Sequence, residues 1–214
     1  MTKDPAIPRK QPSQARAKST VSRVLDGTRK ILKEQGADAI STRNISRVTG
    51  ISPGSIYQYF GNKEQILFRL YGERLKQSVD AITSISTVDY FALPLPEFWS
   101  KMRETLAKEG WGQVIYTELN RAIADNPLLQ ESVRDILEEL YDCLIFIMRN
   151  YGSTWSTNDL RHLAEYIFGI NHFGYTLRNR QSEQYSGNTV KLTNELEYYL
   201  ICKAINDLPP SQIV

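Results

Sequence analysis

Apolar residues along this chain recur at intervals of three and four positions, which is the spacing of one face of an α-helix. Residues 84–96 interrupt the pattern and contain Pro94 and Pro96, which predicts a loop. No segment shows the strict alternation of a half-buried strand, so we expect an all-α fold. The predicted longer helices cover residues 20–35, 63–84, 96–109, 112–125, 127–150, 157–180 and 189–206.

Two shorter helical patterns lie between residues 41 and 64, separated by a tight turn. Ser41 or Thr42 is placed to cap the first, because a hydroxyl oxygen accepts a hydrogen bond from a free backbone N–H. Gly50 marks the turn, since glycine adopts a positive φ without steric cost. Ser52 and Pro53 begin the second helix as its cap and first residue. Two helices joined by such a turn, the second with a polar outer face, indicate a DNA-binding helix-turn-helix.

The run GISPGSIYQYFGNKE, residues 50–64, resembles the DNA-binding signature of the TetR family of bacterial transcriptional regulators. The matching residues are Gly50, Ile51, Ser52, Gly54, Ser55, Ile56, Tyr57, Tyr59, Phe60, Asn62, Lys63 and Glu64. The resemblance implies an N-terminal three-helix helix-turn-helix domain and a larger C-terminal helical domain for ligand binding and dimerisation, with about nine helices in all. We accordingly expect a flexible basic arm over residues 1–18, the DNA-binding domain over 19–64 and the second domain over 65–214.

Charge is unevenly distributed along the chain, although the net charge is only +2. Residues 1–76 contain 15 Lys and Arg against 6 Asp and Glu, whereas residues 77–214 contain 11 against 18. A basic N-terminal part that carries the helix-turn-helix suits the phosphate backbone of DNA. The arm either follows that backbone or is a solvated tail.

Direct recognition of bases requires a helix whose outer face carries hydrogen-bonding side chains. Gln58 is the best candidate for a base contact, because a glutamine amide can form two hydrogen bonds with the edge of adenine. The resemblance places Thr42, Tyr57, Tyr59 and Lys63 at the DNA backbone; alternatively, either tyrosine packs within the small domain. The predicted DNA-binding residues are Thr42, Arg43, Ser52, Pro53, Gly54, Ser55, Tyr57, Gln58, Tyr59 and Lys63.

One recognition helix covers too few base pairs for useful specificity, whereas a two-fold dimer places two helices in successive major grooves and recognises a palindrome. The resemblance implies that the last two helices of each subunit form the dimer interface. Alternatively, the apolar stripes of these helices fill only the subunit's own core. The predicted interface residues are Leu163, Ile167, Ile170, Gly174, Leu196, Leu200 and Lys203, with Gly169 and Gly174 allowing close helix approach.

Aromatic residues are frequent in the helices that follow residue 96, and a cavity among them suits an apolar or aromatic small molecule. The predicted pocket residues are Trp99, Trp111, Ile115, Glu118, Tyr141, Phe146, Tyr166, Asn171, His172 and Tyr175. The resemblance implies a repressor that its ligand releases from a double-stranded DNA operator. Two alternatives stay open, a regulator whose ligand promotes DNA binding and a non-specific DNA-binding protein.

The sequence contains no nucleophile motif, phosphate-binding glycine loop or metal cluster, so we expect neither an enzyme nor a cofactor. His162 and Glu165 stand three residues apart, but two ligands are too few to predict a metal site. No apolar run approaches the ~20 residues of a membrane span, and no signal peptide is evident. We expect a cytoplasmic protein with Cys143 and Cys202 as reduced thiols.

Overall fold

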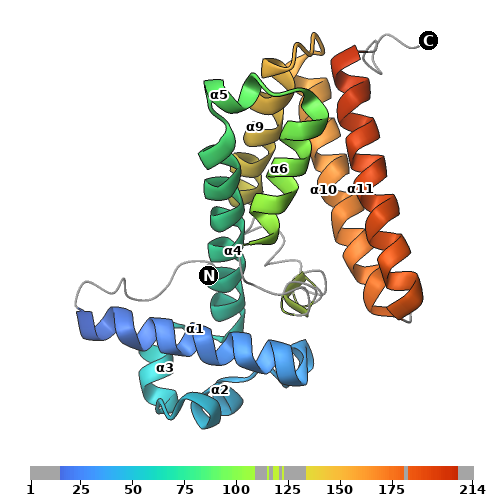
Figure 1. Ribbon diagram of the computed structural model, residues 1–214. Coiled ribbons are helices and arrows are strands. Elements are labelled where there is room, and N and C mark those ends of the chain that lie inside the picture. Colours follow the sequence, from blue (N-terminus) through green and yellow to red (C-terminus); the bar gives the residue numbers. More distant parts are fainter. Residues whose placement is uncertain are drawn as a thin grey trace. The chain divides into compact units, whose positions relative to one another are not determined.

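The computed structural model describes residues 15–108, 115, 118–120, 122, 134–180 and 183–206. All regular structure in these residues is helical, which confirms the predicted all-α class (Figure 1). The elements are α1 (Ala15–Gln35), the 3-10 helix η1 (Ala37–Ala39), α2 (Thr42–Thr49), α3 (Pro53–Tyr59), α4 (Lys63–Ile85), α5 (Val88–Phe91), α6 (Leu95–Ala107), α9 (Arg134–Asn150), α10 (Thr157–Arg180) and α11 (Glu183–Asn206). None of these helices is long and apolar enough to cross a membrane.

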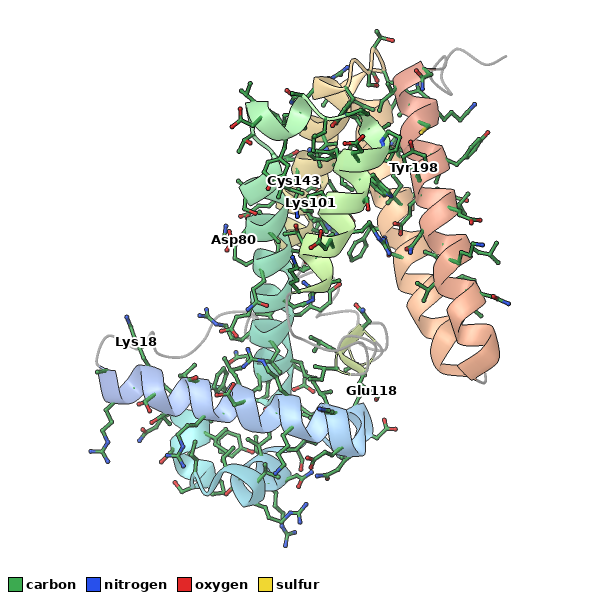
Figure 2. The ribbon with its side chains drawn as sticks, viewed as in Figure 1. Lys18, Asp80, Lys101, Glu118, Cys143 and Tyr198 are labelled. Atoms are coloured by element: carbon green, nitrogen blue, oxygen red, sulfur yellow. The ribbon has the colours of Figure 1, made fainter. Side chains whose placement is uncertain are left out.

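Three element boundaries differ from the sequence prediction. Helix α1 begins at Ala15, so Arg16 and Lys18 belong to this helix and not to an arm (Figure 2). The sequence ARAK at this point consists of strong helix formers, which explains the extension. The short helix α5 lies inside the predicted loop 84–96, and α11 begins at Glu183 instead of residue 189. Residues 1–14, most of the predicted helix 112–125, and 127–133 lie outside the described residues.

The described chain forms two compact units, and helix α4 contributes to both. The first unit consists of residues 1–74 with 111–135, and the second of residues 75–110 with 136–214. The first unit thus extends beyond residue 64, where we expected the DNA-binding domain to end. It also takes in a segment that we expected to lie in the ligand-binding domain.

The core of the first unit is built by α1 to α4. Its side chains are apolar and almost fully buried because each helix turns one stripe of its surface inward. Burial of these groups is the main favourable contribution to the stability of so small a unit. The core residues include Val24, Ile31, Leu32, Ile45, Ile56, Phe60, Ile66 and Leu70.

Gly27 is the point at which α1 packs most closely against α2. A Cβ atom at this position would lie 2.2 Å from Thr49 Cγ2. Thr49 has little freedom to move away, because its Oγ1 donates to the Ile45 carbonyl at 2.7 Å and accepts from the Ile51 N–H at 3.2 Å. The Arg23 guanidinium also donates to the Thr49 carbonyl, at 2.8 Å. The contact between the two helices therefore requires glycine at residue 27.

Replacing Gly27 by alanine is expected to destabilise the protein by about 1–3 kcal/mol, the usual cost of overpacking a core. The measurement is the midpoint of urea unfolding, followed by the far-ultraviolet circular dichroism signal. The matched control is Gly54→Ala in α3, because a Cβ there meets no atom within 4 Å. Equal midpoints for the two variants would contradict the proposed role of Gly27.

The second unit has one continuous apolar core that α4, α6, α9, α10 and α11 share. Phe91 and Phe98 stack with ring centroids 5.2 Å apart, and Tyr151 packs edge-on against both. Helices α10 and α11 lie side by side along much of their length (Figure 1). Other buried members are Trp99, Met102, Tyr141, Ile147, Met148, Trp155, Leu160 and Ile201.

Candidate nucleic-acid interface

The turn between α2 and α3 has the geometry that the sequence predicts. Ser41 Oγ accepts a hydrogen bond from the Asn44 N–H at 3.1 Å, and Ser52 Oγ accepts one from the Ser55 N–H at 3.2 Å. Gly50 adopts φ 70°, and Pro53 is the first residue of α3. Both caps, the glycine turn and the proline position are therefore confirmed, and together they fix α3 relative to α2.

The outer face of α3 is polar and open to solvent. Gln58 is exposed and Tyr57 is 45% exposed, whereas Ile56 is completely buried. The Tyr57 hydroxyl lies 3.1 Å from Thr42 Oγ1, so it connects the start of α2 to α3. Of the other predicted contact residues, Arg43, Ser52, Pro53, Gly54 and Lys63 are exposed, and Thr42, Ser55 and Tyr59 are half-buried.

This arrangement gives a short helix whose exposed groups donate and accept hydrogen bonds at a fixed distance from a second short helix. Such a pair matches the dimensions of a major groove and its flanking phosphates. The positive charge of the N-terminal part adds a long-range attraction for DNA. The geometry therefore suits duplex DNA.

The outer surface of α2 contains a second polar feature that the sequence pattern did not reveal. A hollow of about 420 Å³ is lined by Ser41, Arg43, Asn44, Ser46 and Arg47. Only Arg43 among these was predicted to bind DNA. The spacing of four residues between Arg43 and Arg47, which places both on one helix face, is the sequence signal that would have found the second arginine.

Several of the predicted dimer-interface residues also make contacts within their own subunit. Leu163 and Ile167 belong to the core of their own subunit, where they are 9% and 3% exposed. Gly174 allows a close helix contact, but with Thr193 of the same chain, whose Oγ1 would lie 2.6 Å from a Cβ at residue 174. Leu200 packs partly against the same core, and Lys203 is half-buried.

Three of the predicted interface residues line an open apolar groove on α10 and α11, namely Ile170, Gly174 and Leu196. The groove measures about 850 Å³. A Cβ atom added at Gly169 would meet no other atom within 4 Å, so that side of α10 is free to accept a neighbour. The groove is lined by His162, Glu165, Tyr166, Gly169, Ile170, Phe173, Gly174, Leu177, Thr189, Leu192, Thr193 and Leu196.

The described members of the predicted ligand pocket lie in different surroundings. Trp99 and Tyr141 are buried in the core of the second unit, but Phe146 and Tyr166 are 51% and 64% exposed. Ile115 and Glu118 belong to the first unit. Asn171 is half-buried. Trp111 and the side chains of His172 and Tyr175 lie outside the described residues.

Glu118 has a hydrogen-bond partner within the first unit. One of its carboxylate oxygens accepts a hydrogen bond from the Ala37 N–H at 2.7 Å. This amide opens η1, shortly after the end of α1. The contact joins Glu118 to the chain between α1 and α2 through one of its two carboxylate oxygens.

The second unit contains an ion pair between Arg103 and the buried carboxylate of Glu197. Glu197 of α11 is 1% exposed, and one of its carboxylate oxygens accepts from the Arg103 guanidinium at 2.8 Å. The other oxygen, Oε1, has no hydrogen-bond partner. Burial raises the pKa of Glu197 to about 7, although the positive charge of Arg103 opposes this rise. Arg103 also donates to Asn194 Oδ1.

A helix-turn-helix with an exposed polar recognition helix, in a chain whose described residues are otherwise helical, is typical of DNA-binding regulatory proteins. Residues 24–70 match the family model described as bacterial regulatory proteins, tetR family. Solved TetR-family structures share the fold over most of the chain. The helix-turn-helix segment of this chain is therefore similar to that of the TetR family, and the solved structures show that the chain shares the fold of TetR-family proteins.

The individual relatives either match only a short segment of this chain or share less than a fifth of its sequence. The fatty acid metabolism regulator protein of Bacillus subtilis is 32% identical over 57 residues, which is 27% of this chain and 29% of that protein. The matched region thus spans less than a third of that relative. A TetR-family regulator from Pectobacterium atrosepticum has a TM-score of 0.63 at 18% identity, covering 92% of this chain and 100% of that one. FadR from Bacillus subtilis in complex with stearoyl-CoA has a TM-score of 0.59 at 19% identity, covering 87% and 98%.

Proposed function

We propose that this chain is a repressor that binds a palindromic DNA operator as a homodimer and is released by a small apolar ligand. The observation that carries the proposal is the exposed face of α3, on which Gln58 and Tyr57 project from a capped helix-turn-helix. Glutamine distinguishes adenine by two hydrogen bonds in the major groove. The polar groups around it suit the phosphates on either side.

The homodimer in this proposal is supported by the apolar groove on α10 and α11. Large apolar side chains rarely gather on the surface of a monomer, because their exposure to water is unfavourable. A second copy of the same surface would cover them by two-fold symmetry. The exposed apolar side chains on these two helices are Tyr166, Phe173, Leu192, Leu196 and Tyr199.

For the effector we propose an apolar or aromatic molecule that binds in the second unit. The aromatic content of its core, which includes Phe98, Trp99 and Tyr141, provides favourable surroundings for such a molecule. Long-chain acyl-CoA compounds are the first to test, because a protein of similar fold was solved with stearoyl-CoA. Binding of the effector would lower DNA affinity to the extent that it prefers a conformation incompatible with the operator.

The test of the proposal is selection from a random pool of duplex DNA. We expect an enriched palindrome with two half-sites about one helical turn apart, near 34 Å or somewhat more. Enrichment without two-fold symmetry would contradict the dimer, and binding without enrichment would favour a non-specific DNA-binding protein. Stearoyl-CoA and palmitoyl-CoA are then titrated against the complex, and higher affinity in their presence would indicate a ligand-promoted regulator.

Replacing Gln58 by alanine is expected to relax one base position in each half-site of the selected palindrome. The expected loss of discrimination is about 1–3 kcal/mol, the contribution of one two-pronged base contact. The measurement is a competition of single-base operator variants for the protein. A uniform loss over all positions would mean that Gln58 contacts phosphate and not a base.

A further inference from the structure

The side chain of Asn44 forms the junction between α1, η1 and α2. Its amide nitrogen donates to Gln35 Oε1 and to the Ala39 carbonyl, each at 3.0 Å. Its Oδ1 accepts from Arg47 Nε at 3.2 Å and from Arg47 Nη2 at 2.8 Å. Both ends of the amide are therefore engaged, and its orientation is fixed by elements outside α2.

This contact holds the Arg47 guanidinium in one orientation without neutralising it. An amide oxygen carries no net charge, so the positive charge of Arg47 stays available to another group. Arg47 is exposed, and within the described part of the chain no carboxylate forms an ion pair with it or with Arg43. A guanidinium that is already oriented loses less conformational entropy when it binds.

The surroundings of Arg47 favour an anion. Arg43 lies one helical turn earlier, and both arginines line the hollow of about 420 Å³ together with the hydroxyl-bearing Ser41 and Ser46. Two like charges at this spacing repel each other, which an anion bound between them would offset. Guanidinium groups and hydroxyls are also the usual partners of phosphate oxygens.

The position of the hollow indicates which anion binds there. Thr42, the neighbour of Arg43, is joined through its Oγ1 to the hydroxyl of Tyr57 on the exposed face of α3. The hollow is therefore next to the surface that we propose for the major groove. A duplex whose bases meet α3 carries its phosphates along this side.

We propose that Arg47, oriented by Asn44, is a DNA-backbone contact that binds a phosphodiester group together with Arg43. Helix α2 then contributes a second set of contacts beside the recognition helix α3. The inference rests on the proposed DNA-binding function and adds a residue that neither the family signature nor the sequence pattern identified. Asn44 acts as a positioning residue in this arrangement.

The experiment compares Arg47→Ala with Lys101→Ala. The control removes one positive charge from α6, so the two variants have equal net charge. Binding is measured at several salt concentrations, both to the selected operator and to an unrelated duplex of equal length. Arg47→Lys is included because lysine keeps the positive charge but has no planar guanidinium with two N–H groups that could donate to Asn44 Oδ1.

We expect Arg47→Ala to weaken binding to both duplexes by a similar factor, on the order of 5–20-fold at low salt, and to reduce the salt slope by about one. Arg47→Lys is expected to keep the salt slope and to lose part of the affinity. Lys101→Ala is expected to bind both duplexes as the unchanged protein does. Circular dichroism spectra confirm that each variant is folded.

Identical affinities and slopes for Arg47→Ala and Lys101→Ala would overturn the inference. A loss confined to the selected operator would also overturn it, because Arg47 would then recognise a base. If the unchanged protein enriches no sequence but Arg47→Ala still lowers the salt slope, the phosphate contact stands and the proposed repressor function fails. If the unchanged protein binds no duplex at low salt, both fail.

Discussion

Replacing Leu192 by aspartate is expected to convert the proposed homodimer to a monomer. Leu192 is 65% exposed and lines the apolar groove on α10 and α11. Covering a leucine contributes about 1.5–3 kcal/mol, and a two-fold interface contains the residue twice. The dimer dissociation constant should therefore rise at least about 100-fold, and more if a carboxylate is forced into an apolar contact.

The same variant should lose tight operator binding, because a monomer presents only one recognition helix. Sedimentation equilibrium gives the oligomeric state, and titration of the selected operator gives the affinity. The fold itself should survive, since a side chain this exposed contributes little to the subunit's own core.

The matched control is Val88→Asp. Val88 is 86% exposed on α5. The substitution therefore introduces the same negative charge at an exposed apolar residue outside the groove. It should leave the dimer unchanged. A dimeric Leu192→Asp protein, or equal dissociation of both variants, would show that the groove is not the interface.

The unfolding free energy is expected to depend on pH through Glu197. In the folded protein the pKa of this carboxyl is about 7, whereas its ordinary value is 4.5. Between these values the folded state binds more protons at this carboxyl than the unfolded state. The contribution of Glu197 to stability is therefore fully present below about pH 4.5 and is lost as the pH rises through 7. A shift of this size corresponds to about 3 kcal/mol over that window.

Replacing Glu197 by glutamine should remove this contribution, because an amide does not titrate and its oxygen still accepts from Arg103. The unfolding free energy of the unchanged protein minus that of the variant should therefore decrease between pH 5 and pH 8, at constant protein concentration. Glu195→Gln is the control, since Glu195 is exposed on the same helix. Parallel stability curves for Glu197→Gln and the unchanged protein would contradict the titration of a buried Glu197.

The local features of the helix-turn-helix could be predicted because each depends on neighbours within a few residues. Ser41 and Ser52 cap helices through amides three positions away, and Gly50 satisfies a backbone angle at its own position. Periodicity likewise predicted the long helices of the described residues, namely α1, α4, α6, α9, α10 and α11. The start of α1 at Ala15 was missed because the helix formers there carry no apolar stripe.

The roles of the later helices could not be predicted in the same way. Leu163 and Ile167 lie on an apolar stripe much like that of Leu192 and Leu196, yet the first pair faces the subunit core and the second pair faces solvent. Gly174 is a small residue on a helix, but only the position of Thr193 shows which helix approaches it. A stripe indicates that a surface will be covered, not what covers it.

The sequence by itself thus determined the all-α class, the capped helix-turn-helix and the separation of charge, since these follow from residue type and spacing. Only the tertiary structure decided that Asn44 orients Arg47, that Glu118 binds the Ala37 amide, and that Glu197 is buried. Glu118 and Glu197 meet partners far away in the chain, and Asn44 is held by atoms of α1 and η1. Such contacts depend on how the helices pack, which residue spacing within one helix does not specify.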